Sequence, residues 1–225
     1  MNTKTMNLSA GGAVLTLLAG GCGHPTLPSV ASTGSASPVN GNDSGRPRHL
    51  YVGLDTSTSW RPHLGVSAML CARQAMRLDP DHDRLTLYRL DSATREFFDD
   101  PAPESGDRLQ RTIVTEVASV SETRGTFPAL FWMAAATRAE ADAGPVTVEI
   151  FSDGDNDDQT ARSASTIRAA AHRLAANPQV SGVWVFGAEP RNWAALRAEF
   201  APLGGRFHLC VPPDMTADRV AQALP

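Results

Sequence analysis

Strand-like and helix-like segments alternate from His49 to the end of the sequence, and this alternation restricts the folds open to the chain. The clearest strand patterns are the apolar and β-branched runs HLYVGLD (49–55), VTVEIFSDG (146–154) and VSGVWVFG (180–187). Longer stretches between them, such as TFPALFWMAAATRAEADAG (126–144), repeat apolar residues at helical spacing. Strands that alternate with helices pair mainly in parallel and need helices on both faces. The sequence therefore predicts a doubly wound α/β domain.

One pair of strand-like runs departs from this alternation. DRLTLYRLDS (83–92) and REFFDD (95–100) are separated only by a short turn, which is typical of a hairpin. With RFHLCV (206–211) as the last run, the sequence predicts six strands. We expect a mainly parallel six-stranded sheet with one antiparallel edge strand.

The first residues have the pattern of a secretory signal. An apolar run from about Leu8 to Gly21 is too short to span a bilayer stably, and it ends in small residues before Cys22. Ala19, Gly20 and Gly21 before this cysteine resemble the lipobox of bacterial lipoproteins, in which the signal is cleaved and the cysteine is lipidated. We expect a signal peptide at residues 1–21 and a lipid on Cys22; the alternative is a plain secretory signal with an incidental cysteine.

The segment after Cys22 is rich in Pro, Ser, Gly, Ala and Asn and has almost no large apolar residues. Such a composition does not bury enough surface to fold, so residues 22–47 are expected to form a flexible tether ahead of a domain at 48–225. The order of lipid, tether and domain predicts a membrane-anchored lipoprotein of the bacterial envelope, facing the periplasm or the exterior.

Composition and missing motifs argue against two classes of function. The net charge of −4 and the lack of a basic stripe give no reason to expect nucleic-acid binding. The nucleophile elbow G-x-S-x-G, the P-loop and G-x-G-x-x-G are all absent. We therefore expect a protein that is not an enzyme, with hydrolase activity the less favoured alternative.

Two aspartates stand at the ends of predicted strands. Asp55 ends the first strand, Asp153 ends the strand that starts at Val146, and ligands of doubly wound sheets bind at the carboxyl ends of strands. Ser57 and Ser59 follow Asp55 at alternate positions, so both hydroxyls can point to the same place. Carboxylate and hydroxyl oxygens favour a hard cation such as Mg²⁺, or Mn²⁺, over a soft metal.

Asp55, Ser57 and Ser59 resemble the D-x-S-x-S of the von Willebrand factor A (integrin I-like) family. ETRGTFPALFWMAAA (122–136) is similar to the family's threonine loop, and IFSDGDND (150–157) to its strand ending in T/S-D-G. The resemblance covers His49 to Leu224 and implies a metal-ion-dependent adhesion site with one divalent cation, to which Thr126 and Asp153 also contribute. It also implies that an Asp or Glu of a protein partner completes the coordination. Helix capping and turn formation are the ordinary alternatives for each motif taken singly.

Loops around this site are expected to determine which partner binds. The candidate partner-binding residues are Trp60, Arg61, His63, Arg124, Asp155 and Trp193. The two tryptophans have the alternative of packing against the domain's own helices. For the whole protein, the alternatives to metal-dependent adhesion or assembly are a metal-free scaffold and a component that presents a client within a larger complex.

The two remaining cysteines are predicted to stay unpaired. The family resemblance places the first strand centrally and the last at the far edge of the sheet, with Cys71 on the helix after the first strand and Cys210 on the last strand. Three strand spacings of ~4.8 Å separate these strands by roughly 14 Å, whereas a disulfide needs Cα atoms within ~7 Å. We expect two buried free thiols.

Overall fold

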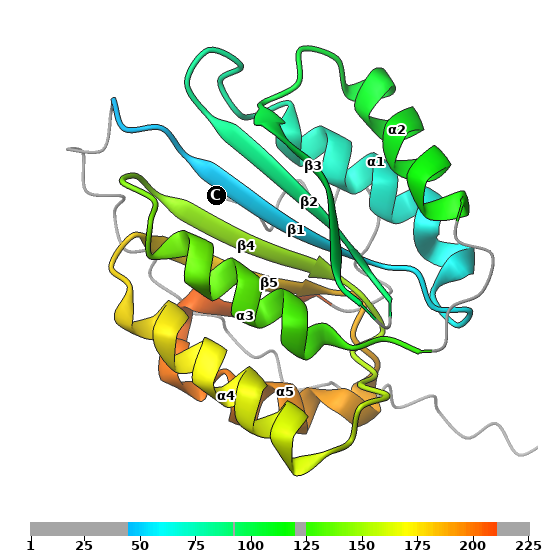
Figure 1. Cartoon of the computed structure of the whole chain (residues 1–225), viewed down its shortest axis with the longest axis vertical. Coiled ribbons are helices and arrows are strands. Elements are labelled where there is room, and N and C mark those ends of the chain that lie inside the picture. Colours follow the sequence, from blue (N-terminus) through cyan, green and yellow to red (C-terminus); the bar gives the residue numbers. More distant parts are fainter. Residues whose placement is uncertain (1–44, 92, 120–124, 211–225) are drawn as a thin grey trace, which may run out of the picture. The chain divides into compact units, whose positions relative to one another are not determined.

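The computed structural model describes residues 45–91, 93–119 and 125–210. Its sheet has six strands in the order β3-β2-β1-β4-β5-β6, which confirms the predicted fold class (Figure 1). Only the β2–β3 pair is antiparallel; the other four pairs are parallel. The strands are β1 (His49–Asp55), β2 (Arg84–Leu90), β3 (Arg95–Pro101), β4 (Val146–Phe151), β5 (Val180–Phe186) and β6 (Phe207–Cys210).

Helices cover both faces of the sheet. On one face are α1 (Leu64–Ala75) and α2 (Gly106–Ala118); on the other are α3 (Pro128–Ala139), α4 (Ala161–Ala176) and α5 (Trp193–Glu199) (Figure 1). Short 3₁₀ turns lie at η1 (Arg61–His63), η2 (Pro190–Asn192) and η3 (Ala201–Arg206). Within the part of the chain described here, no helix is long and apolar enough to cross a membrane.

Alternate residues of β1 pack into two separate hydrophobic cores, one on each face of the sheet. Leu50, Val52 and Leu54 pack with α1 and α2, whereas Tyr51 packs with α3 and α4. Because both faces are buried, the strand is apolar almost throughout instead of alternating between apolar and polar residues. Gly53 lets α3 approach closely, since a Cβ at this position would lie 3.1 Å from the Phe131 ring.

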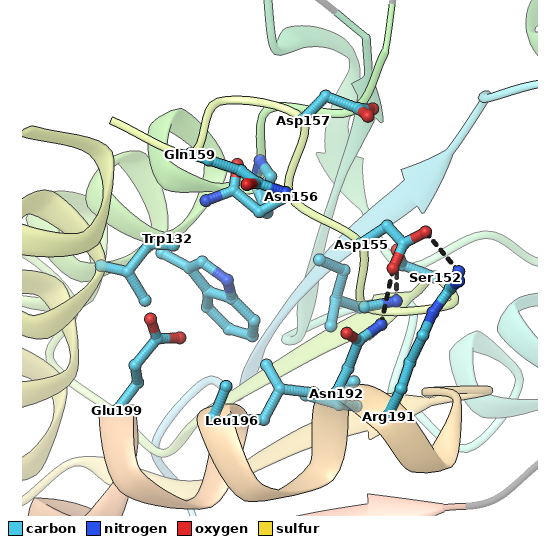
Figure 2. A pocket seen from close by; sticks show the side chains of 16 residues that line it. Trp132, Ser152, Asp155, Asn156, Asp157, Gln159, Arg191, Asn192, Leu196 and Glu199 are labelled. Atoms are coloured by element: carbon cyan, nitrogen blue, oxygen red, sulfur yellow. Dashed lines mark hydrogen bonds and ion pairs between the residues drawn. The ribbon is translucent and has the colours of Figure 1, made fainter. Parts of the chain in front are cut away.

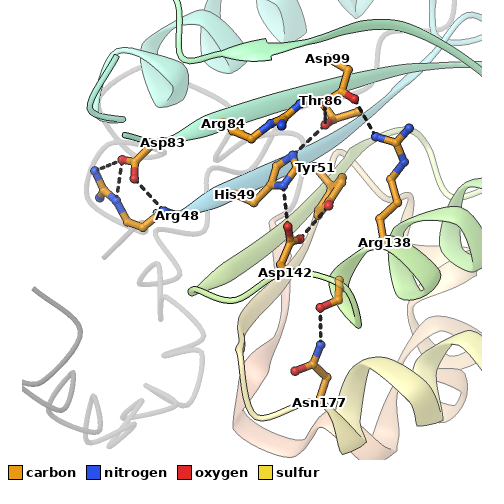
Figure 3. A network of polar contacts seen from close by, with 11 residues as sticks. Arg48, His49, Tyr51, Asp83, Arg84, Thr86, Asp99, Arg138, Asp142 and Asn177 are labelled. Carbon is orange, nitrogen blue, oxygen red and sulfur yellow. Dashed lines mark hydrogen bonds and ion pairs between the residues drawn. The ribbon is translucent and has the colours of Figure 1, made fainter. Parts of the chain in front are cut away.

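The amino end of β1 carries a buried polar network (Figure 3). His49, the first residue of the predicted first strand, is 7% exposed and contacts Asp142 Oδ1 through Nδ1 at 3.0 Å and Thr86 Oγ1 through Nε2 at 2.8 Å. Tyr51 donates to Asp142 Oδ2 at 2.7 Å, and Thr86 donates to Asp99 Oδ1 at 2.9 Å. These contacts fix the start of β1 against its neighbours.

Cys71 and Cys210 form no disulfide with each other, as predicted, but only one of them is fully buried. Cys71 in α1 is buried, whereas Cys210 is partly exposed because β6 is the edge strand. Cys22, nearly all of the predicted tether, Arg124 and the residues after Cys210 lie outside the described residues.

Candidate functional site

The five side chains predicted as cation ligands meet at the carboxyl ends of β1 and β4. Thr126 donates its hydroxyl to Asp55 Oδ1 at 2.9 Å, and the Ser57 amide donates to the same oxygen at 2.7 Å. The Ser57 and Ser59 hydroxyls are 3.1 Å apart, and Ser59 donates to Asp153 Oδ2 at 2.7 Å. A continuous chain of contacts thus joins residues from three loops that are distant in sequence.

Ser152 belongs to this site although the sequence assigned it no role. Its hydroxyl donates to Asp55 Oδ2 at 2.6 Å and accepts from the Gly154 amide at 3.1 Å. Both oxygens of Asp55 are therefore hydrogen-bonded. The signal was available, because Ser152 fills the serine-or-threonine position of the motif that ends β4.

Asp157 is a second residue of the site that the predicted ligands and partner-binding residues did not include. Its Oδ2 accepts from the Thr126 amide at 2.7 Å, and its own amide donates to the Thr126 carbonyl at 3.1 Å. Gly125 makes this approach possible: its φ is +111°, and a Cβ there would lie 2.7 Å from Asp157 Oδ2. The β4–α4 loop (152–160) thereby holds the threonine loop in place.

The loop after β5 positions Asp153 through its backbone. The carbonyl of Asp153 accepts from the Glu189 amide at 2.8 Å and from Asn192 Nδ2 at 3.0 Å. The side chain's other oxygen, Oδ1, accepts from the Asp155 amide at 3.0 Å. Gly154, with φ of +81°, turns the chain sharply after Asp153.

The site is rich in negative charge. Asp55 is 1% exposed and Asp153 5% exposed, and no ion pair formed within residues 45–91, 93–119 and 125–210 involves either one. Burial raises the pKa of Asp55, and the hydrogen bonds from Ser152, Ser57 and Thr126 offset this only in part. A buried carboxylate without a positive partner is costly.

The donor set fits a hard divalent cation. Two carboxylates and three hydroxyls offer only oxygen, and a hydroxyl that donates to a carboxylate keeps lone pairs for a cation. The described residues contain no group of three or more His, Cys, Asp or Glu side chains able to hold a metal. A cation at this site would therefore depend on the hydroxyls as well as the carboxylates.

Two of the predicted partner-binding residues near β1 are accessible, but Trp60 is not. Arg61 and His63 are exposed in η1, whereas Trp60 is only 2% exposed and packs in the core beneath α1. The turn after β1 folds Trp60 inward, with its amide donating to the Ser57 carbonyl at 3.2 Å. For Trp60, the alternative of packing within the domain is the one observed.

The candidates on the other side of the site are partly committed to contacts within the domain. Asp155 pairs with Arg191 at 2.6 Å and accepts from Asn192 at 2.8 Å. Trp193 is half-buried, and its indole N–H donates to the Ala188 carbonyl at 2.8 Å. Each keeps some exposed surface beside the site.

Comparison with known proteins identifies relatives of the fold only. No protein-family model matches the sequence, and no curated protein matches it. Solved structures do match. The PilB minor pilin from Streptococcus sanguinis superposes with a TM-score of 0.57 at 9% identity over 83% of this chain and 61% of that one. A von Willebrand factor type A protein from Catenulispora acidiphila gives 0.55 at 15% identity over 79% and 42%.

A third match is close to this chain in extent. An aerotolerance-related membrane protein from Bacteroides fragilis gives a TM-score of 0.54 at 14% identity over 77% of this chain and 95% of that one. The chain thus spans about three fifths of the minor pilin and two fifths of the Catenulispora protein. Taken together, the matches show that this chain has a von Willebrand factor A-like fold.

Proposed function

We propose that the domain binds a protein partner through one divalent cation, Mg²⁺ or Mn²⁺. The ligands are the two carboxylates and three hydroxyls of Asp55, Asp153, Ser57, Ser59 and Thr126. One observation carries the proposal: these oxygens converge around two buried carboxylates that form no ion pair within the described part of the chain. A cation from solution would supply the missing charge.

The same ligand set supports binding in preference to catalysis. Where a carboxylate contacts the cation through water, it neutralises the cation only incompletely, and a cation held here would then keep its attraction for a further carboxylate. Ser59 is exposed, and so are Arg61 and His63, which gives the site an open side toward a partner. An Asp or Glu of the partner would complete the coordination.

We place this module in the bacterial envelope, anchored by a lipid on Cys22 and extended on the tether. The leader pattern supports this placement, and two proteins that share the fold are a minor pilin and a membrane protein. Adhesion or envelope assembly is the proposed role. A metal-free scaffold, or a component that presents a client, remains the alternative.

Isothermal titration of the full chain with Mg²⁺ and Mn²⁺, after treatment with a chelator, tests the cation site. We expect saturable binding that is lost in Asp55→Ala and Thr126→Ala and kept in Asp81→Ala, which removes an exposed carboxylate elsewhere. A second titration in the presence of acetate supplies the carboxylate expected from a partner. If the folded protein binds neither metal under either condition, the proposal is wrong and the scaffold reading replaces it.

A further inference from the structure

A pocket of about 440 Å³ opens beside the cation site, between α3, α4 and α5 (Figure 2). This volume lies within the usual range for ligand pockets. Side chains from the sheet and the three helices form its apolar lining, chiefly Trp132, Ile150, Ile167, Val185 and Leu196. All but Leu196 are at most 3% exposed and form the floor of the pocket, so an apolar group that enters would lie over this floor and against Leu196.

The polar residues of the pocket carry an excess of negative charge. Asp155, Asp157 and Glu199 line it, against one cationic residue, Arg191. Arg191 is already paired with Asp155 at 2.6 Å and with Glu189 at 3.0 Å. Figure 2 shows this pair on one side of the pocket and Glu199 on the other.

Glu199 is the carboxylate in the pocket that lacks a partner. It is half-buried at the end of α5, and its carboxylate forms no hydrogen bond or ion pair with the described part of the chain. Burial raises its pKa, and the Arg168 charge opposes this only weakly. A cation arriving from outside would stabilise the ionised carboxylate.

We propose that this pocket binds the long cationic side chain of a lysine or arginine. The apolar stem lies along Trp132 and Leu196, and the charged head meets Glu199. Lysine and arginine have this division into an apolar stem and a charged end. An apolar side chain would leave Glu199 unpaired, and an acidic one would be repelled by it.

The pocket and the cation site share a wall, which indicates where the basic residue comes from. Ser152 lines the pocket and also donates to Asp55, while Asp157 lines it and holds Thr126. We therefore assign the basic side chain to the same protein partner that offers the carboxylate. This assignment of the carrier rests on the proposed function, whereas the pocket's preference for a cation does not.

The preference is tested with two small probes of equal stem length. Nα-acetyl-lysine methylamide carries the charge and Nα-acetyl-norleucine methylamide lacks it. Each is titrated into the full ¹⁵N-labelled chain in chelator, and the indole N–H signal of Trp132, assigned with Trp132→Phe, is followed by NMR. We expect saturable binding of the lysine probe and binding at least fivefold weaker for norleucine.

Substitutions in the pocket test whether Glu199 causes the preference for the lysine probe. Glu199→Gln should remove the difference between the probes, and Glu104→Gln, an exposed glutamate with the same change, should keep it. Ala195→Trp, at an exposed position that lines the pocket, should block both probes without disturbing the core. Equal binding of the two probes, no binding of the lysine probe, or a preference that survives Glu199→Gln would overturn the proposal.

Because chelator is present throughout, this result is independent of the cation site. If the lysine probe does not bind while Mg²⁺ does, the pocket proposal is wrong and the proposed cation site is unaffected. If lysine binding succeeds while Mg²⁺ titration fails, the pocket stands and its link to a metal-bound partner falls.

Discussion

The carboxylates near the two ends of β1 have different kinds of partner. At the amino end, Asp142 contacts His49, and Asp99 contacts Arg138 at 3.0 Å and Arg84 at 3.1 Å. At the carboxyl end, Asp55 receives only hydroxyl and amide hydrogen bonds. At the amino end the carboxylates contact His or Arg side chains, whereas at the carboxyl end Asp55 forms no ion pair with the described part of the chain.

The pKa shifts at the two ends have opposite signs. Burial acts to raise the pKa of Asp142, but the hydrogen bonds from His49 and Tyr51 bring it below the ordinary value. Asp99 behaves in the same way, with Arg138 and Thr86 outweighing burial. For Asp55 burial prevails, and the pKa is raised. Asp142 and Asp99 are less buried than Asp55 and lie near cationic groups, whereas burial determines the direction of the shift at Asp55. The comparison teaches that hydrogen bonds from hydroxyl and amide groups do not offset complete burial of this carboxylate.

Breaking the paired end should have the largest effect. Asp142→Ala leaves His49 and the Tyr51 hydroxyl without their acceptor, in surroundings that are largely buried. We expect the free energy of unfolding to fall by about 3 kcal/mol. Chemical denaturation measures this loss, and adding Mg²⁺ should not restore it. A loss no greater than that of Asp81→Ala would show that the network contributes little.

Neutralising the unpaired end should act through the cation instead. In chelator, the free energy of unfolding of Asp55→Asn should lie within about 1 kcal/mol of that of the unmodified protein. The reason is that the substitution removes a buried charge that forms no ion pair with the described part of the chain. At Mg²⁺ concentrations about 100 times the dissociation constant, the unmodified chain should gain about 2.7 kcal/mol and the variant nothing.

The matched variant Asp142→Asn sharpens this contrast between the two ends. It should be destabilised in chelator and should still gain stability from Mg²⁺. Denaturation curves of Asp55→Asn and Asp142→Asn, with and without Mg²⁺, measure both the stability in chelator and the stability gained from Mg²⁺. Equal responses to Mg²⁺ in both variants would remove the distinction between the two ends of β1.

Another carboxyl group, that of Glu149 in the middle of β4, responds to burial in a further way. It is 1% exposed, and its Oε2 has no hydrogen-bond partner among the described residues. Burial raises its pKa to about 8, with the Arg77 charge offsetting only part of the shift. This group is therefore expected to remain protonated at neutral pH, a response to burial different from those of Asp142 and Asp55.

Protonation of Glu149 predicts how stability changes with pH. The pKa of Glu149 in the folded state lies above its ordinary value of 4.5, so the folded state holds a proton that the unfolded state releases. The contribution of this bound proton to the free energy of unfolding is complete below about pH 4.5. It is lost as the pH rises toward about 8. We expect unfolding free energy to fall by roughly 1 kcal/mol per pH unit between pH 5 and 8.

Glu149→Gln isolates this contribution, because it keeps the shape of the side chain and removes the titration. Denaturation in chelator at each pH should give a flatter profile for Glu149→Gln than for the unmodified chain or for Glu104→Gln. Parallel profiles for all three proteins would show that Glu149 does not hold its proton on folding.

The sequence predicted the part of the site that follows from strand direction and alternation. Asp55 and Asp153 end parallel strands, and the alternating serines follow one of them, so their convergence could be deduced without coordinates. The burial of Trp60 could not, because it depends on how one turn folds onto α1. The contacts of His49 could not be predicted for a similar reason: its partners Asp142 and Thr86 lie on other elements, and nothing local in the sequence identifies them.

Supporting contacts between loops were the hardest to foresee. The contact between Asp157 and Thr126 joins residues 31 positions apart and depends on the loop conformation at Gly125. The smallest predicted effect tests that contact. Gly125→Ala adds a Cβ where φ is +111° and where Asp157 stands within 2.7 Å, so the two loops must separate. We expect a loss of about 1–2 kcal/mol in unfolding free energy, together with weaker Mg²⁺ binding.

Gly204→Ala is the matched control for this change. Gly204 also has positive φ, at +56°, but a Cβ there would meet nothing within 4 Å. The control should carry the backbone strain without the collision, and so should lose stability while binding Mg²⁺ normally. Titration of both variants separates the two contributions. If Gly125→Ala binds Mg²⁺ as Gly204→Ala does, then the contact with Asp157 does not hold Thr126 in position, and the carboxyl end of β1 tolerates looser loops than its hydrogen bonds indicate.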